Sequence, residues 1–333
     1  MTQLASPRAR VGAVDGFPAL AAASDRLRRC VAADGSAVEL VLVVESDLAL
    51  ALATLRLANN GPRRGTVGSV AEAVHVAGPA RLRAMADRIP SADPLSHESG
   101  DAPRQHFRLH CLTVQATVER VAIATNRHER DELLTAALLH DIGKLALGAD
   151  DDDVSLLDSD LRAEEPEARL QLERARYGTD HAELGAELAL HLGLPARIAQ
   201  VIAEHHTATA GWAGMVRLAD MLALYGQGRL VDLPVLVDLS AAVGLAREQL
   251  GRLMYELPQP VATGRRSLQS CPLSARELEV LERLAAGQVY KQIGAGLGLS
   301  PSTVRSHLHR IYTRIGVPDR TQAVLLARDC GWI

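Results

Sequence analysis

The chain has 333 residues, enough for two or three domains, and 47% of them are hydrophobic, enough for a packed core. The formal net charge of -4 excludes a basic field over the whole chain, so any nucleic-acid-binding surface has to be local. The four cysteines are scattered, which indicates reduced thiols in a cytoplasmic protein and argues against a disulfide framework. The sequence predicts neither a signal peptide nor a membrane-spanning segment.

Leucine and alanine recur at helical spacing along nearly the whole chain, and alternating strand patterns are nearly absent. We therefore predict an all-α fold. Residues 1–90 are expected to form several short helices, including 46–59 and 69–87, before a loop at 91–105 that is rich in Pro, Ser, Gly and Asp. Further helices are predicted at 106–126, 130–146, 180–192, 195–205, 211–225 and 246–256.

Two stretches have the composition of connecting segments. An acidic segment between 149 and 168, which begins with four consecutive aspartates, is predicted to be a solvated loop before a short helix. Residues 258–271 contain Pro, Gly and Arg and are predicted to be a linker. The residues after this linker, 272–333, form a separate pattern and are expected to be a domain of their own.

A candidate metal site centres on the stretch from His140 to Lys144. Adjacent His140 and Asp141 offer a nitrogen and a carboxylate oxygen to one divalent ion, such as Zn, Fe, Mn or Mg. Further candidate ligands lie in separate helix-like segments: His110, His181, His205, His206 and Asp220. A single histidine on an apolar face is more often a core residue than a ligand, but burying the whole set without a metal would be costly. Lys144, one turn beyond His140, is placed to meet an anionic phosphate oxygen.

This ligand series resembles that of the HD superfamily of metal-dependent phosphohydrolases. Within this superfamily, the chain is most similar to the HDOD subgroup. Five stretches carry this similarity: Asp47–Gly61, Val70–Val74, Gly178–Leu188, Gly193–Pro195 and Val216–Leu222. It covers about residues 12–257 and implies an all-helical domain with a signalling or regulatory role. In this view, residues 1–105 are the N-terminal helical part of an HDOD-like domain, and residues 106–257 are its HD-type metal-binding part.

The resemblance also implies roles for the ligands. One metal ion would be held by His110, His140, Asp141 and Asp220. Asp141 would bridge to a second ion held by His181 and His205, so one or two ions are expected.

These residues are compatible with catalysis and with sensing. A metal-bridging water could lose a proton and attack phosphorus, with Lys144 or His206 facing the phosphate as the candidate catalytic residues. The same residues could instead bind a nucleotide-like or phosphorylated ligand without turnover. The Gly-Tyr-Pro signature of cyclic dinucleotide phosphodiesterases is absent after His206, where the chain reads Thr-Ala-Thr-Ala-Gly-Trp-Ala.

The C-terminal pattern begins with a clear helix start. Ser274 is a predicted N-cap, and Glu277 completes a capping box with it. A second helix is expected at about 289–297, followed by a turn at Gly298 and a third helix from Pro301, which Ser300 caps. A fourth helix is expected at about 320–329. Residues 271–333 contain eight Lys or Arg and five Asp or Glu, so this region is locally positive.

These residues resemble the LuxR-type helix-turn-helix over 272–329. The similar stretches are Leu273–Glu277, Leu284–Gly287, Leu297–Ser300, Thr303–His307 and Arg320–Ala323, together with Lys291 and Ile293. By this resemblance, the candidates for base-edge contacts are Arg305, Ser306 and His309. The candidates for DNA-backbone contacts are Lys291, Thr303, His307 and Arg310.

The two resemblances together predict a transcription regulator that binds double-stranded DNA as a homodimer. Its HDOD region would bind metal and sense a nucleotide-like or phosphorylated effector. The alternative is a metal-dependent phosphohydrolase, acting on nucleotides or cyclic nucleotides, with a DNA-binding tail.

Overall fold

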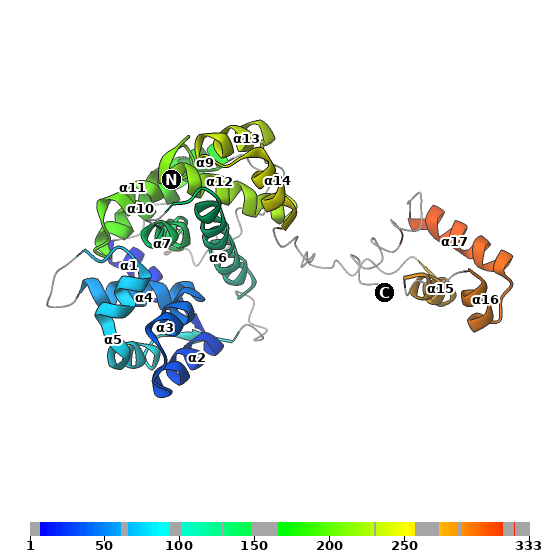
Figure 1. The fold of residues 1–333 in the computed structure, drawn as a ribbon, viewed down its shortest axis with the longest axis horizontal. Coiled ribbons are helices and arrows are strands. Elements are labelled where there is room, and N and C mark those ends of the chain that lie inside the picture. The colour runs from blue at the N-terminus through cyan, green and yellow to red at the C-terminus, as the bar shows by residue number, and fades with distance from the viewer. Residues whose placement is uncertain are drawn as a thin grey trace. The chain divides into compact units, whose positions relative to one another are not determined.

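The computed structural model describes residues 7–60, 66–93, 101–127, 130–147, 166–229, 231–256, 273–285, 288, 290–315 and 323. The chain divides into two compact units, Met1–Gln259 and Pro260–Ile333 (Figure 1). The predicted all-α fold is confirmed. The predicted linker at 258–271 and nearly all of the acidic segment lie outside the described residues.

The described residues of the N-terminal part of the first unit form five helices and a short strand before residue 87. In chain order these are α1 (Pro7–Asp15), β1 (Ala19–Leu20), α2 (Ala21–Ala32), α3 (Ala37–Glu45), α4 (Leu48–Asn59) and α5 (Val70–Ala86). The α3 helix starts at a capping box, in which the Ser36 side chain accepts from Glu39 N and the Glu39 side chain accepts from Ser36 N. The strand β1 pairs in parallel with β2 (Ser91–Ala92), a pairing too short to leave a sequence pattern.

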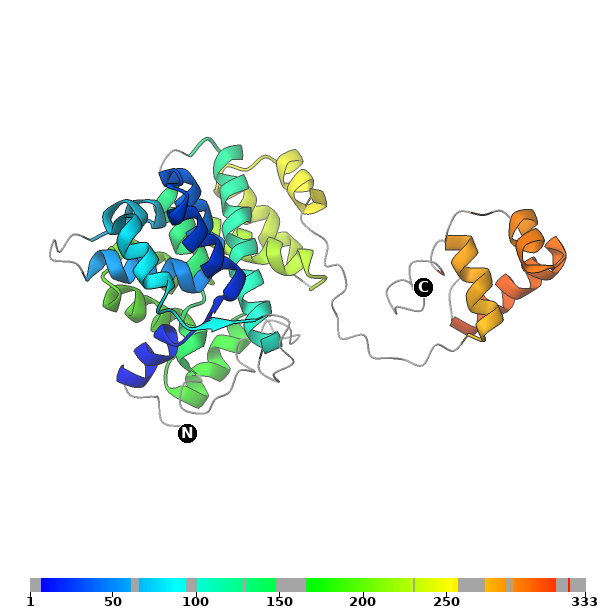
Figure 2. The same cartoon turned by 90° about the horizontal axis from the view of Figure 1, so that it is seen from below.

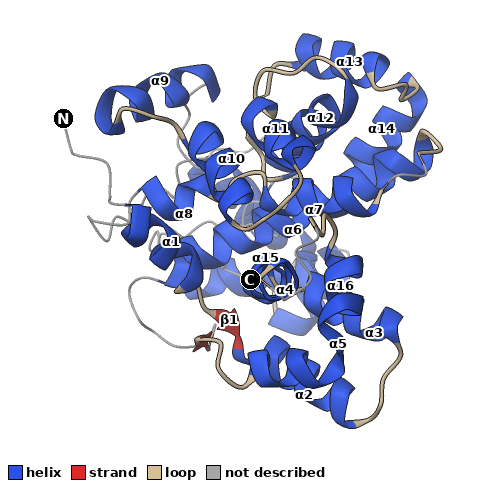
Figure 3. Cartoon of the chain, turned by 90° about the vertical axis from the view of Figure 1, so that its left-hand side faces the viewer, coloured by secondary structure: helices blue, strands red, loops and turns tan. Residues whose placement is uncertain are grey.

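The remaining helices of this unit follow from residue 101. They are α6 (Asp101–Ala124), α7 (Asp131–Leu139), α8 (Gly143–Leu147), α9 (Pro166–Tyr177), α10 (His181–His191), α11 (Ala196–Glu204), α12 (Gly211–Gly226), α13 (Leu233–Ala242) and α14 (Arg247–Glu256). Figures 1 and 3 show α2 to α5 gathered at one end of the unit and α11 to α14 at the other, with α6 and α7 between them.

Two boundaries and one whole helix differ from the sequence prediction. The helix expected at 130–146 is broken between Leu139 and Gly143, so His140 and Asp141 lie between α7 and α8. Residues 101–105 of the expected loop form the start of α6 instead. Pro103 does not prevent this, because it falls in the first turn of the helix, where proline is tolerated. The helix α13 was not predicted, although Asp232 accepts from Val235 N as its N-cap.

One buried carboxylate joins three elements of this unit. Asp47 Oδ1 accepts hydrogen bonds from the backbone N–H groups of Ala49 and Leu50 at 2.9 and 3.1 Å, which caps α4. Its Oδ2 accepts from Leu20 N in β1 at 2.9 Å and lies 3.3 Å from Arg108 Nε in α6. The N-terminal helices are thereby attached to the helix that carries His110.

Gly143 is required where α8 crosses α10. A Cβ atom at this position would lie 1.9 Å from the backbone oxygen of His181 and 2.7 Å from Gly185 N. We expect Gly143→Ala to force the helices apart and destabilise the protein by at least ~1–3 kcal/mol in urea unfolding. Gly251→Ala is the control, because a Cβ there would meet nothing within 4 Å. Equal stability of the two variants would contradict this packing argument.

Glu45 gives the first unit a predicted pH dependence. Partial burial, with Asp131 and Glu119 nearby, raises the pKa of Glu45 from 4.5 to about 7, although Arg130 opposes the shift. Between these two values the unfolded chain ionises Glu45 while the folded chain holds its proton, so stability falls as pH rises through this window.

We therefore expect Glu45→Gln to stabilise the protein by about 1 kcal/mol at pH 8, and by less towards pH 5. This is below the full linkage value because the side chain is only half-buried. Urea unfolding at both pH values measures the difference, with Glu248→Gln on the exposed face of α14 as control. A gain that did not depend on pH would rule out this origin.

The second unit is a three-helix arrangement over the described residues (orange in Figure 2). Its helices are α15 (Ala275–Ala285), α16 (Tyr290–Leu297) and α17 (Pro301–Ile315). They enclose a small core made of Leu273, Val280, Leu281, Leu284, Ile293, Val304, Leu308, Ile311 and Ala323. The helix predicted at 320–329 lies outside the described residues, apart from Ala323.

Glu277 links the first and last of these helices. Its Oε2 accepts from the N and Oγ of Ser274 at 2.9 and 2.8 Å, and lies 2.5 Å from Arg314 Nη1. The predicted capping box is therefore present, with an added ion pair to α17. Glu277→Gln should destabilise this unit by about 1–2 kcal/mol.

Hydrogen exchange of α15 in the full chain measures this loss. The control is Glu279→Gln, which removes the exposed partner of Arg276 and should cost under about 1 kcal/mol. Indistinguishable exchange in the two variants would contradict a structural role for Glu277.

Candidate metal centre and DNA-binding module

The seven predicted His and Asp residues come together between helices of the first unit. Three of them lie at helix ends: His140 follows α7, His181 begins α10 and His205 follows α11. Asp141 occupies the break between α7 and α8, and His206 follows His205. His110 and Asp220 project from the interiors of α6 and α12. All seven residues are at most 8% exposed.

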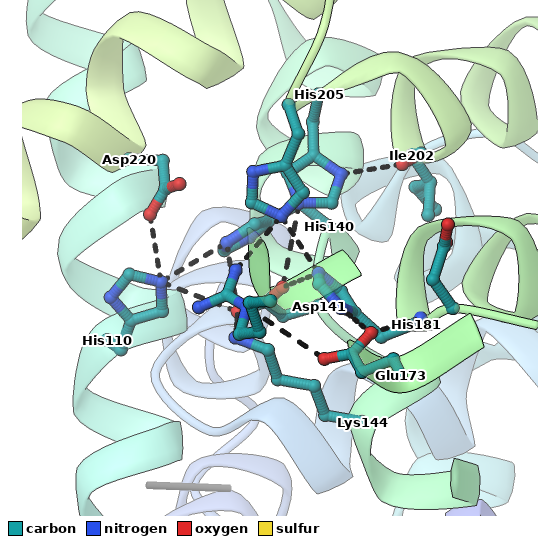
Figure 4. Close-up of polar contacts among 12 residues, drawn as sticks. His110, His140, Asp141, Lys144, Glu173, His181, Ile202, His205 and Asp220 are labelled. Carbon is teal, nitrogen blue, oxygen red and sulfur yellow. Dashed lines mark hydrogen bonds and ion pairs between the residues drawn. The ribbon is translucent and has the colours of Figure 1, made fainter. Parts of the chain in front are cut away.

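Asp141 lies at the centre of this group (Figure 4). Its Oδ1 is 3.3 Å from His181 Nε2 and 3.6 Å from His205 Nε2. Its Oδ2 is 3.5 Å from His110 Nε2 and 3.4 Å from His140 Nε2. The two carboxylate oxygens therefore face two different sets of ring nitrogens.

The donor atoms form two groups that could each hold an ion. In one group, donor atoms of Asp141, His181, His205 and His206 all lie within 4.8 Å of one another; in the other, those of His110, His140 and Asp220 do. Within the second group, His110 Nε2 is 3.3 Å from His140 Nε2 and 3.2 Å from Asp220 Oδ1. Two ligands at zinc-like bond lengths of about 2.0–2.1 Å in a tetrahedron are about 3.3 Å apart. The spacing fits a shared ion.

Three of the histidines have their outer ring nitrogen fixed. Nδ1 of His140 and Nδ1 of His205 lie 2.7 and 2.6 Å from the backbone oxygen three residues earlier. Nδ1 of His181 lies 2.6 Å from Glu173 Oε2. Because a carbonyl or carboxylate accepts a hydrogen bond from the Nδ1–H group, Nε2 is the ring nitrogen that is turned towards Asp141 and is available to an ion. This is the arrangement of metal-ligating histidines.

Electrostatics keep the two central residues in ligand-competent forms. Burial alone would raise the pKa of Asp141, but Lys144 and His140 hold this pKa well below 3.8. Burial lowers the pKa of His140 to about 4, so its imidazole is neutral near pH 7. Lys144 was predicted to face a phosphate. In the structure its Nζ donates to Asp141 Oδ2 at 2.6 Å, so the lysine pairs with the central carboxylate.

His181 differs from its neighbours. Burial opposes its charge, yet Glu173 and Asp141 raise the pKa of His181 above 6.5. Its Nε2 is 2.9 Å from His206 Nε2, and burial together with His205 and His181 holds the pKa of His206 well below 6.5. An ion at His181 Nε2 would take the place of a proton, because ligation requires the bare lone pair.

Sequence reasoning missed two polar residues of the centre, both on α9. Glu173 contacts His181, and Arg169 Nη2 lies 3.2 Å from His206 Nε2. Both side chains are buried. Their spacing of four residues puts them on one face of a helix, which was the available signal. The acidic residues before α9 obscured this spacing, because they led to the prediction of a solvent-exposed loop for most of the stretch.

In the second unit, α17 presents the predicted recognition surface. Arg305, Ser306 and Arg310 are exposed, and Thr303 and His307 are half-buried. Thr303 N donates to Ser300 Oγ at 3.1 Å, which is the predicted cap. The side chains of Lys291 in α16 and His309 in α17 lie outside the description.

Comparison with known families decides what these units are. The profile of the HDOD domain matches residues 17–208, more than half of the chain. The chain belongs to the HDOD family. The profile of bacterial regulatory proteins of the luxR family matches residues 271–327, so the HDOD protein carries a LuxR-type DNA-binding regulator domain at its C-terminal end.

Individual relatives agree with this division. The MmoQ response regulator of Methylococcus capsulatus superposes with a TM-score of 0.56 at 25% identity, over 72% of this chain and 98% of that one. The "Probable transcriptional regulatory protein NarL" of Mycobacterium tuberculosis is 54% identical over 52 residues, which is 16% of this chain and 24% of NarL. The CsgBAC operon transcriptional regulatory protein of Escherichia coli is 40% identical over 63 residues, 19% of this chain and 29% of that protein.

The chain thus spans only about a quarter of the length of these curated relatives. Among the helices that the structure describes, none is both long and apolar enough to cross a membrane.

Proposed function

We propose that this HDOD protein is a transcription regulator whose first unit holds a divalent metal centre that governs DNA binding by the second. The observation that supports the metal most strongly is the common orientation of His140, His181 and His205. Each has Nδ1 fixed by an acceptor and Nε2 turned towards Asp141. An ordinary buried histidine needs no such shared direction.

The donor set limits the choice of metal. Five imidazoles and two carboxylates suit Zn, Fe or Mn better than Mg, which prefers oxygen ligands. The proposed ligands of one ion are His110, His140, Asp141 and Asp220. With Asp141 bridging, His181 and His205 would hold a second ion, close to His206.

For DNA binding, α17 is the proposed recognition helix in the major groove. Arg305 is exposed and can make the bidentate contact that arginine makes with guanine. One such module makes few contacts, so we propose a homodimer on a two-fold symmetric site.

DNA binding with and without metal tests this function. Fluorescence anisotropy with genomic fragments, at one fixed salt concentration, would compare metal-loaded and chelator-treated protein. The proposal expects sequence-selective binding whose affinity changes with metal loading. Selective binding with the same affinity in both metal states would contradict a regulatory role of the metal. Absence of selective binding in both states would contradict the assignment as a transcription regulator.

A second candidate function is phosphoester hydrolysis. It is favoured by the complete ligand set and by Lys144, whose ammonium is buried beside the central carboxylate. A bound metal would supply an activated water, while Lys144 or His206 would face the phosphate. Metal-loaded protein incubated with a panel of nucleotides and cyclic nucleotides tests this. Metal-dependent turnover that is lost in Lys144→Met would favour hydrolysis, and no turnover would favour sensing.

A further inference from the structure

The inward face of α9 is unusually polar. Arg169, Glu173 and Tyr177 follow one another at four-residue spacing, and all three are buried. Tyr177 joins the hydrophobic core of the first unit. A helix that packs on a protein core ordinarily does so through an apolar stripe. Arg169 Nε lies 3.9 Å from Glu173 Oε1, which is too long for a hydrogen bond, so burying the two charges also depends on their other contacts.

Both charged residues end on the candidate metal centre. Glu173 Oε2 accepts from the backbone N of His181 at 2.9 Å and lies 2.6 Å from its Nδ1. Arg169 Nη2 lies 3.2 Å from Nε2 of His206. A further contact joins α9 to the start of α10. Arg174 Nη2 lies 2.5 Å from Oδ2 of Asp180, the residue that caps α10 just before His181.

We infer that α9 is a metal-responsive helix and that Glu173 is the positioning residue that couples it to the centre. This inference rests on the proposed metal centre. Glu173 holds His181 with Nε2 towards Asp141 and makes that nitrogen a better ligand. An ion on Nε2 in turn makes the Nδ1 proton a stronger donor to Glu173, which tightens the attachment of α9.

The coupling has to work in both directions. If docking of α9 raises the affinity for metal by some factor, metal raises the docking equilibrium of α9 by the same factor. A purely structural Glu173 would instead lower stability without changing how α9 responds to metal.

The test uses the full chain, with Mn²⁺ and Zn²⁺ as probes. Isothermal titration measures metal affinity, and hydrogen exchange measures protection of α9 with and without the ion. Glu173→Gln keeps the size of the side chain but removes its charge, and Glu173→Asp keeps the charge but shortens the reach. Glu167→Gln is the matched control, because Glu167 lies on the same helix but is exposed.

Metal should slow exchange in α9 of the wild-type protein and of Glu167→Gln. Glu173→Gln should bind metal about 10–100-fold more weakly and lose the metal-induced protection of α9, and Glu173→Asp should fall between. The inference is overturned, with the metal centre intact, if Glu173→Gln binds metal like the wild type or if wild-type α9 exchanges alike in both states. If the wild-type protein binds neither ion, the metal centre and the inference fail together.

Discussion

Asp141→Asn is expected to lower metal affinity by at least about 100-fold and to remove most of the metal-dependent stabilisation. The carboxylate is central because its two oxygens face the ring nitrogens of both donor groups. Asparagine keeps the volume but loses the charge and puts an NH₂ group where one ligand oxygen stands. At a metal concentration of 100 times the wild-type Kd, the wild-type protein should gain about 2.7 kcal/mol of stability, and the variant should gain at most about 0.4 kcal/mol.

Thermal unfolding with and without metal measures this difference. Asp238→Asn is the control, because Asp238 is an exposed aspartate on α13 and its loss should leave the metal-dependent gain unchanged. Removing Asp141 also leaves Lys144 buried without its carboxylate, so the variant should be less stable even without metal. For this reason, the metal-dependent gain is the decisive quantity. If Asp141→Asn kept that gain, the assignment of Asp141 as a ligand would be wrong.

Arg305→Ala should weaken binding to the preferred DNA sequence by about 10–100-fold while changing non-specific binding much less. A bidentate arginine–guanine contact contributes about 1–3 kcal/mol of discrimination, whereas a phosphate contact acts on all sequences alike. Arg310 is also exposed on α17 and is one of the four predicted contacts to the DNA backbone. Arg310→Ala should therefore weaken both specific and non-specific binding. It should also reduce the slope of log affinity against log salt concentration by about one.

Anisotropy titrations of both variants on specific and scrambled duplexes, at several salt concentrations, separate these effects. Arg252→Ala controls for the lost charge, since Arg252 is exposed on α14 in the other unit. An Arg305→Ala protein that kept its sequence preference would show that α17 does not read bases through this residue.

The site was more predictable than the helix boundaries around it. His110, His140, Asp141, His181, His205, His206 and Asp220 were all proposed from residue type and helical context, and the structure brings all seven together. Their use as metal ligands stays a prediction. The helical period could not reveal the break at residues 140–142, because Ile142 and Leu145 continue the apolar pattern across it.

The contacts that orient the candidate ligands could largely not be predicted from the sequence. The hydrogen bond between His181 and Glu173 depends on how α9 packs beside α10, and the ion pair of Asp47 with Arg108 joins residues that are far apart in the chain. Gly143 is a different case. Its place in the His140–Lys144 stretch was visible in the sequence. The reason for a glycine there appears only in the packed structure, where a Cβ atom would lie 1.9 Å from the backbone oxygen of His181.

We propose a metal ion in this HDOD unit, between α6, α7, α10, α11 and α12. Anomalous X-ray diffraction from crystals of the purified full chain, collected above and below the absorption edges of Mn, Fe and Zn, tests it most directly. We predict an anomalous peak within ligand distance of His110, His140, Asp141 and Asp220, with a second peak near His181 and His205 if two ions bind. Well-ordered side chains with no anomalous scatterer among them, in crystals grown with each metal, would contradict the metal centre.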